Sequence, residues 1–208
     1  MGRTQNTGNY WRSAIAVSVP PCSIAARFNL SSLNTRDCIN YLFGSTNYYG
    51  INFDGTYFQA RMRASAALST AAVSGVAIST STWYNVVATF ASANTRSIYV
   101  DGVGVTDSTA NSAPTAPTTL DVGGPNDSGV GLIGVVAEVG FWNAALDASE
   151  AAAYGKGISP QLIRPASLIG YWPMIGKNSP ELPHHGPYSL TVTGTAVVGA
   201  HPRVYYRT

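Results

Sequence analysis

Residues 82–102 read TWYNVVATFASANTRSIYVDG, and this stretch decides the fold class. Its first part, residues 83–90, is rich in β-branched and aromatic residues, and residues 96–100 follow after a short polar turn. Such residues favour β-strands, and an Asp-Gly pair such as Asp101-Gly102 favours a tight reversal of the chain. The stretch therefore predicts adjacent antiparallel strands that end in a turn.

The same kind of pattern extends along the chain in both directions. Apolar residues recur at every second position in several segments, which include Ile24/Ala26/Phe28, Ile39/Tyr41/Phe43, Tyr49/Ile51/Phe53 and Phe58/Ala60/Met62. A period of two gives each strand one buried face and one solvated face. Gln59, Arg61 and Arg63 fall on the solvated face of their segment, and Asp54-Gly55 before it predicts a two-residue hairpin turn.

One helix interrupts the strands. Asp147-Ala-Ser-Glu150 has the sequence of a capping box, and glycines at 155 and 157 end the helical segment. We therefore predict an all-β chain, an antiparallel β-sandwich jelly roll of about twelve strands with one short helix at about 147–155. We expect residues 10–200 to form the sandwich, between an N-terminal arm, residues 1–9, and a C-terminal arm, residues 201–208.

The composition of the chain limits the kinds of molecule that we expect it to bind. The net charge is +2 and the basic residues are scattered singly, whereas nucleic-acid binding needs a concentrated basic surface. No apolar run approaches the roughly 20 residues of a membrane span, and the N-terminus lacks the core of a signal peptide. We therefore expect neither nucleic acid nor membrane as a partner, and synthesis in a cytoplasm.

Charged residues make up only 11% of the chain, and depletion of charge is typical of surfaces that neighbouring subunits cover. A homo-oligomer is therefore one expectation. The two cysteines, Cys22 and Cys38, flank the first predicted hairpin at about one strand length, roughly 20 Å, which is too far for a disulfide. We predict two free and mostly buried thiols.

The order of these motifs resembles the laminin-G-like jelly rolls of the concanavalin A-like lectin/glucanase superfamily. The resemblance rests on the hairpin at 82–102, on Gly131-Leu-Ile-Gly134 followed by Ala137-Glu-Val-Gly-Phe-Trp142, on the helix segment 145–150, and on Leu168-Ile-Gly-Tyr-Trp-Pro173. It covers roughly residues 10–200, and it implies a two-sheet sandwich.

The C-terminal region resembles a narrower group, the stand-alone versions of this domain among the virion structural proteins of tailed phages. The segments that carry this resemblance are 158–165, 171–173, 190–194 and 201–203. It implies a virion protein assembled in the host cytoplasm, with other virion proteins as partners. The terminal arms would then clamp neighbouring subunits.

No catalytic residue is predicted. Glycoside hydrolases of the superfamily need two carboxylates about 5–9 Å apart. Of the three glutamates, Glu150 belongs to the helix cap together with Asp147, Glu181 lies in a loop, and Glu138 stands alone in an apolar strand. We expect Glu138 to be structural, held by backbone amides or by an arginine, with a metal or ligand role as the alternative.

Two kinds of binding site remain as candidates. Relatives in this fold often bind calcium, and Asp121, Asn126 and Asp127 offer oxygen ligands for such an ion. The alternative is an ordinary turn, because Asn-Asp-Ser between glycines is also a common turn sequence. No cofactor is expected otherwise. Tyr48, Tyr49 and Tyr57 are candidates for stacking on a glycan, and alternation buries about half of such residues in the core.

The sequence thus leaves three functions open. The first is a non-enzymatic virion protein that decorates a phage head or belongs to the tail or its adhesion apparatus. The second is a carbohydrate-binding lectin module, which is compatible with the first. The third is a glycoside hydrolase, against which the missing pair of carboxylates argues.

Overall fold

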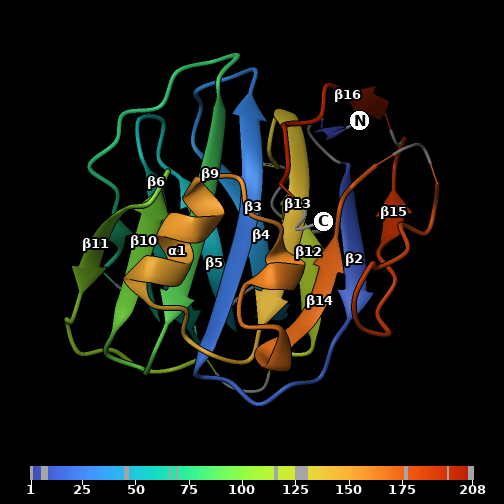
Figure 1. Cartoon of the computed structure of the whole chain (residues 1–208). Coiled ribbons are helices and arrows are strands. Elements are labelled where there is room, and N and C mark those ends of the chain that lie inside the picture. The colour runs from blue at the N-terminus through green and yellow to red at the C-terminus, as the bar shows by residue number, and fades with distance from the viewer. Residues whose placement is uncertain are drawn as a thin grey trace.

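A computed structural model of the chain describes residues 2–5, 9–44, 47–65, 67–68, 70–114, 117–124, 131–175, 178–195 and 197–205, without the side chains of 2–5, 36 and 67–68. Two eight-stranded sheets pack face to face, as a jelly-roll β-sandwich (Figure 1). The prediction of the fold class is therefore confirmed. The described residues form sixteen strands rather than about twelve, because very short strands such as β7 (Ala67–Leu68) and β8 (Ala72–Val73) add to the sheets.

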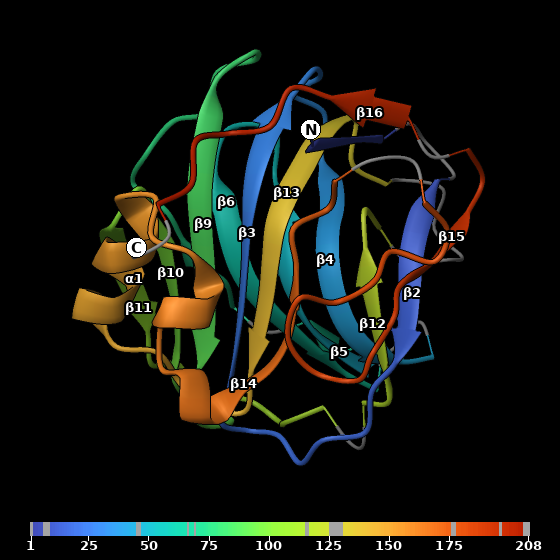
Figure 2. The same cartoon turned by 45° about the vertical axis from the view of Figure 1, so that its right-hand side comes forward.

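Sheet A contains, in spatial order, β11 (Val103–Asp107), β10 (Arg96–Val100), β9 (Trp83–Phe90), β3 (Cys22–Leu30), β13 (Gly134–Trp142), β1 (Gly2–Gln5) and β16 (Val197–Gly199), and β14 (Leu168–Trp172) also pairs with β13. Sheet B contains β15 (Thr191–Thr193), β2 (Tyr10–Ala14), β12 (Thr119–Val122), β4 (Arg36–Phe43), β5 (Asn47–Phe53), β6 (Phe58–Ala64) and β7, and β8 also pairs with β6. The strand ladders are antiparallel. In Figure 2, β3 and β13 lie in the front layer, and β4 and β5 lie in the layer behind it.

The core lies between the sheets and is rich in aromatic rings. Three ring pairs join one sheet to the other: Phe28 and Phe58 at 5.2 Å, Tyr41 and Phe141 at 4.9 Å, and Tyr49 and Phe90 at 5.2 Å. Offset and edge contacts of this kind add to the stability that burial of the rings supplies. The alternating apolar positions of the sequence are thus the inner faces of the two sheets.

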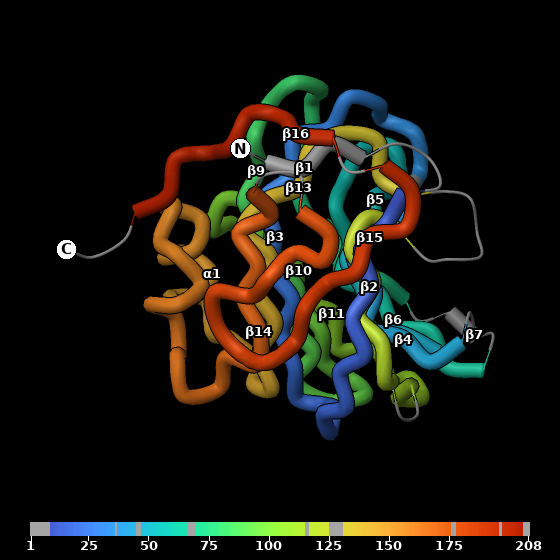
Figure 3. Tube along the Cα trace, turned by 90° about the vertical axis from the view of Figure 1, so that its right-hand side faces the viewer, coloured from blue at the N-terminus to red at the C-terminus, as the bar shows by residue number. Residues whose placement is uncertain are grey.

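The outer face of sheet A is covered by further structure. Helix α1 (Ala148–Gly155) and the 3₁₀ turns η1 (Pro160–Leu162) and η2 (Pro165–Ser167) lie on it and close a second apolar cluster around Trp142, Tyr154 and Tyr171. The capping box of α1 is confirmed, since Asp147 accepts from the backbone of Ser149 and Glu150 and the Glu150 carboxylate accepts from the Asp147 N–H. Figure 3 shows α1 on one side of the sandwich and β4 and β6 on the other.

Several local expectations change. The turn after β5 has four residues, 54–57, because Phe53 pairs with Phe58 and the Asp54 carboxylate accepts from the N–H groups of Thr56 and Tyr57. Phe43, expected in the core stripe, is 54% exposed. The prediction for Cys22 and Cys38 is confirmed, because both are free and buried.

The two terminal segments are built into the sandwich. Residues 2–5, expected in an arm, form β1 between β13 and β16. In the C-terminal segment, Tyr205 exchanges backbone hydrogen bonds with the chain around Gly157, and the carbonyl of Arg203 accepts from Arg27. In the described part of the chain, no helix has the length and apolar character needed to cross a membrane.

Candidate functional site

A row of polar residues crosses the outer face of sheet B. Cross-strand pairing places Arg12 opposite Asp121, Asp121 opposite Asn40, Asn40 opposite Gly50, and Gly50 opposite Arg61. Directly paired residues project to the same face of a sheet. Their neighbours along the strands point into the core, and these are Trp11, Leu120, Ile39, Ile51 and Ala60. Five strands therefore present one continuous polar row outward.

Gly50 stands at the centre of this row. A Cβ at this position would collide with Oδ1 of Asn40, so the Asn40 amide lies over the glycine. Because side chains repeat every second residue in a strand, Tyr48 and Asn52 flank Gly50 on the same face. We name the Gly50 face for the set that it centres, which is Asn40, Tyr48, Gly50, Asn52, Arg61 and Arg63.

Charges gather around Tyr48. Burial raises the pKa of the Tyr48 hydroxyl, the nearby Asp37 carboxylate raises it further, and Arg61 and Arg63 oppose that rise. Asn52 donates from Nδ2 to Oδ1 of Asp37. One carboxylate and two guanidinium groups therefore lie within interaction range of the Tyr48 phenol, and the carboxylate also accepts from an amide.

Several polar atoms of the Gly50 face have no partner among the described residues. These are Oδ1 of Asn40, Oδ1 of Asn52 and Nε of Arg61, all buried. Asn40 and Asn52 are 1% and 7% exposed. A buried polar atom without a hydrogen bond costs about 1–3 kcal/mol, and such atoms are few in native proteins. This arrangement therefore opposes stability and favours binding of a partner that supplies hydrogen bonds.

Asp121 is engaged by Arg12. Its two carboxylate oxygens accept from Nε and NH2 of Arg12 at 2.6 and 2.5 Å, and Arg12 also lies 5.2 Å from the centre of the Tyr10 ring. With both oxygens held by a cation, Asp121 does not fit the role of a calcium ligand. The other candidates, Asn126 and Asp127, lie outside the described residues, and those residues contain no cluster of three metal-binding side chains.

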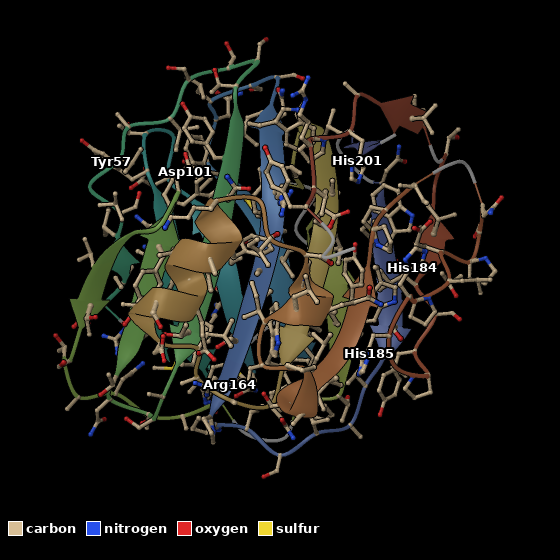
Figure 4. All side chains as sticks on the ribbon, viewed as in Figure 1. Tyr57, Asp101, Arg164, His184, His185 and His201 are labelled. Carbon is tan, nitrogen blue, oxygen red and sulfur yellow. The ribbon has the colours of Figure 1, made fainter. Side chains whose placement is uncertain are left out.

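The three tyrosine candidates lie in different places. Tyr48 belongs to the Gly50 face, whereas Tyr49 is fully buried in the core against Phe90 and does not fit a surface site. Tyr57 lies in the turn between β5 and β6, far across the molecule from His184 and His185 (Figure 4). Asn40, Gly50 and Asn52 are site residues that were not predicted from the sequence. A glycine inside a strand is a signal for a close approach, and it would have pointed to this face.

Glu138 lies on the other sheet and is structural in its contacts. It occupies a bulge of β13, where pairing with β3 shifts between Ala137 and Gly140, and its φ is +56°. Its buried carboxylate accepts from the Tyr171 hydroxyl at 2.8 Å and lies 3.1 Å from Nε2 of His201. The expected partners, backbone amides or an arginine, are thus replaced by a phenol and an imidazole.

Comparisons with known proteins bear on the fold. A laminin-G model described as Concanavalin A-like lectin/glucanases superfamily matches residues 5–152. No curated protein matches the sequence. A putative carbohydrate binding protein from Bacteroides ovatus ATCC 8483 superimposes with a TM-score of 0.67 and 14% identity over 97% of this chain and 60% of that chain.

Two further structures are similar in fold. Domains LG4-5 of the mouse laminin alpha1 chain give a TM-score of 0.55 and 18% identity over 71% of this chain and 42% of theirs. The SAP-like pentraxin from Limulus polyphemus, described as heptameric, gives 0.54 and 12% over 72% and 83%. Identities this low show a shared fold, whereas the family match spans most of the sequence. The chain therefore belongs to the concanavalin A-like lectin/glucanases superfamily, in its laminin-G branch.

Proposed function

We propose that the chain is a non-catalytic glycan-binding domain and that the Gly50 face is its binding surface. The observation that carries the proposal is the pair of buried amide oxygens, Oδ1 of Asn40 and of Asn52, without a partner in the described chain. Because these oxygens are buried, sugar hydroxyl groups can donate to them only when the neighbouring side chains move aside, and the partly exposed Tyr48 beside them offers a ring with a polar edge. The carbohydrate-binding description of the Bacteroides ovatus structure agrees with this proposal.

The carboxylates support binding rather than hydrolysis. On the outer face of sheet B, Asp121 is held by Arg12 and Asp37 accepts from Asn52. Glu138 is buried on the other sheet, and Glu150 caps α1. A hydrolase needs one carboxylate free to donate a proton and a second free to act as base or nucleophile. The engaged carboxylates of this face do not offer that pair.

A glycan-array screen tests the proposal. The purified protein is screened with calcium and again with chelator, and the Tyr48→Ala variant is compared with Tyr57→Ala. We expect saturable binding that does not need calcium, that falls roughly tenfold or more in Tyr48→Ala, and that is unchanged in Tyr57→Ala. Absence of saturable binding under both conditions overturns the proposal. Equal losses in the two variants would move the site away from the Gly50 face.

We further propose that this domain works on the particle of a tailed phage, as a head decoration, tail or adhesion component. The support is the resemblance of segments 158–165 and 201–203 to stand-alone phage domains, together with the low charge. The terminal segments pack on their own chain, so contacts with virion proteins or further copies would use other surfaces. Mass spectrometry of purified particles tests this, and absence of the chain from them would exclude it.

A further inference from the structure

We propose that the glycan bound at the Gly50 face is acidic, and that Arg61 and Arg63 bind the carboxylate of one of its sugars. This inference rests on the proposed function and adds the chemical class of the ligand. It is based on a comparison of the acceptors that the arginine side chains of this molecule contact.

Most of the partly or fully buried arginines meet an acceptor within the chain. Arg12 binds Asp121, Arg96 binds Asp107 at 2.7 Å, and Arg164 binds Glu150 at 2.7 Å. Arg27 donates to two backbone carbonyls. Guanidinium groups buried without an acceptor are costly, which explains the pattern.

Arg61 departs from that pattern. It lies on the outer face of sheet B, partly buried; its Nε, like that of Arg27, is buried without a hydrogen-bond partner, but unlike Arg27 it donates no hydrogen bond to a carbonyl of the described chain. The ion pairs of the described residues do not include it. Directly opposite on β5 is Gly50, which has no side chain to pair with it. The fold thus holds a cation in place without supplying its anion.

Arg63 adds a second guanidinium on the same face. It is two residues from Arg61, about 7 Å along the strand, and is paired across the sheet with Tyr48. Asp37, the carboxylate that faces Tyr48 together with these arginines, already accepts from Asn52. The guanidinium groups of Arg61 and Arg63 therefore lie on the same side of the sheet, close enough to act on the same phenol.

The chemistry of the two groups selects a carboxylate-bearing sugar. A guanidinium binds a carboxylate through two parallel N–H···O bonds, which fixes orientation as well as supplying energy. The neighbouring Oδ1 atoms of Asn40 and Asn52 are acceptors, and once the side chains that bury them move aside they suit the hydroxyl groups of the same sugar. One face therefore offers donors to the carboxylate and acceptors to the ring.

The test compares each acidic oligosaccharide with its own methyl ester, which keeps the hydroxyl groups and removes the charge. The probes are oligosaccharides of galacturonate, glucuronate and mannuronate, together with sialyllactose, and binding is measured by calorimetry. We expect at least one acid to bind roughly tenfold or more tightly than its ester. Arg61→Gln should remove that preference, whereas Lys156→Gln, the same loss of charge at the exposed end of α1, should leave it unchanged.

The outcomes separate this inference from the proposed function. Equal affinity for acid and ester, or binding of neutral glycans alone, overturns the acidic ligand and leaves glycan binding in place. Failure to bind any glycan, acidic or neutral, overturns both. Thermal unfolding shows whether Arg61→Gln is folded, and Arg61→Lys, which keeps the charge without the planar fork, should retain part of the preference for the acid.

Discussion

The outer faces of the two sheets differ in the hydrogen-bond partners that the chain supplies to their polar side chains. On sheet A, the fully buried Glu138 accepts from Tyr171 and contacts His201, and Arg27, 1% exposed, donates to the carbonyls of Ile158 and Arg203. On sheet B, buried oxygens of Asn40 and Asn52 have no partner in the described chain. On sheet A the chain supplies partners to these charged groups, although Nε of Arg27 and Oε1 of Glu138 have no hydrogen bond, whereas on sheet B the two amide oxygens receive none from the described residues.

The difference follows from where the covering segments run. Helix α1, strand β14 and the segment from His201 to Tyr205 lie against sheet A and bring phenols, carbonyls and an imidazole to its charges, whereas β15 pairs with β2 in sheet B. Polar groups buried with partners cost little, whereas polar groups buried without them are tolerated mainly where function needs them. Substitutions on sheet A should therefore change stability, and substitutions on the Gly50 face should change binding.

The largest expected effect on stability is at Glu138. Replacing it by Ala leaves the Tyr171 hydroxyl and the His201 ring without their buried partner. Breaking a buried pair in this way costs about 3–5 kcal/mol of the free energy of unfolding. Denaturant unfolding measures it, and Glu138→Gln, which keeps the shape and one acceptor, should lose less. A cost below about 1 kcal/mol for the Ala variant would contradict the idea that sheet A is completed by these contacts.

His201 makes the same contact dependent on pH. Its ring nitrogens lie 2.8 Å from the Pro202 carbonyl and 3.1 Å from the Pro173 carbonyl, and acceptors at both favour the imidazolium. Burial alone would lower the pKa of His201. The hydrogen bonds to Glu138 and to the Pro202 carbonyl, together with the negative charge of Glu138, outweigh the effect of burial and raise this pKa above 6.5.

The sign of the pH effect follows from that direction. Because the pKa of His201 is higher in the folded chain than in the unfolded chain, protonation of His201 stabilises the folded state. This stabilisation is fully present below the unfolded pKa of 6.5, and it is lost as the pH rises through the folded pKa. We therefore expect the free energy of unfolding to fall as the pH rises from about 6.5 through the higher folded pKa of His201, by less than the Glu138→Ala cost. Denaturant unfolding across this range checks it. His201→Ala should flatten this dependence, and an equal slope in the variant would assign it to another group.

A smaller effect is expected at the helix that covers sheet A. Asp147→Ala removes the acceptor for the N–H groups of Ser149 and Glu150, and loss of an N-cap costs about 1 kcal/mol. Asp147→Asn keeps a side-chain oxygen and serves as the matched control. Thermal unfolding of both variants measures the cost. Equal stability of Asp147→Ala and the parent chain would show that packing alone fixes α1.

The same contrast explains what the sequence predicts well. Alternation places Tyr49 with Ile51 and Phe53, and thereby leaves Tyr48 for the outer face. The capping box locates α1 within one turn, because its signals are local. The pairing of Asn40 with Gly50 and of Gly50 with Arg61 depends on register across three strands. Local patterns thus predict the elements and the inner faces.

Contacts between distant segments are the part that local patterns miss. His201 meets Glu138 only because the chain returns to sheet A after β16, and no spacing in the sequence indicates that return. The sequence therefore predicted a partner for Glu138 of the wrong kind. The strand at residues 2–5 was missed for the same reason, because it forms by pairing with β13 and β16 and is not indicated by the composition of these residues.

The smallest stability effect is expected on the Gly50 face, at Asn40. Asn40→Ala removes a buried oxygen that has no hydrogen bond in the described chain, so its cost should stay below about 1 kcal/mol. Affinity for the bound glycan should nevertheless fall, because a sugar hydroxyl loses its acceptor. Unfolding and calorimetry on the same preparation measure the two quantities. A loss of stability as large as that of Glu138→Ala would mean that Asn40 is held by the fold, and that the two faces do not differ in the way proposed.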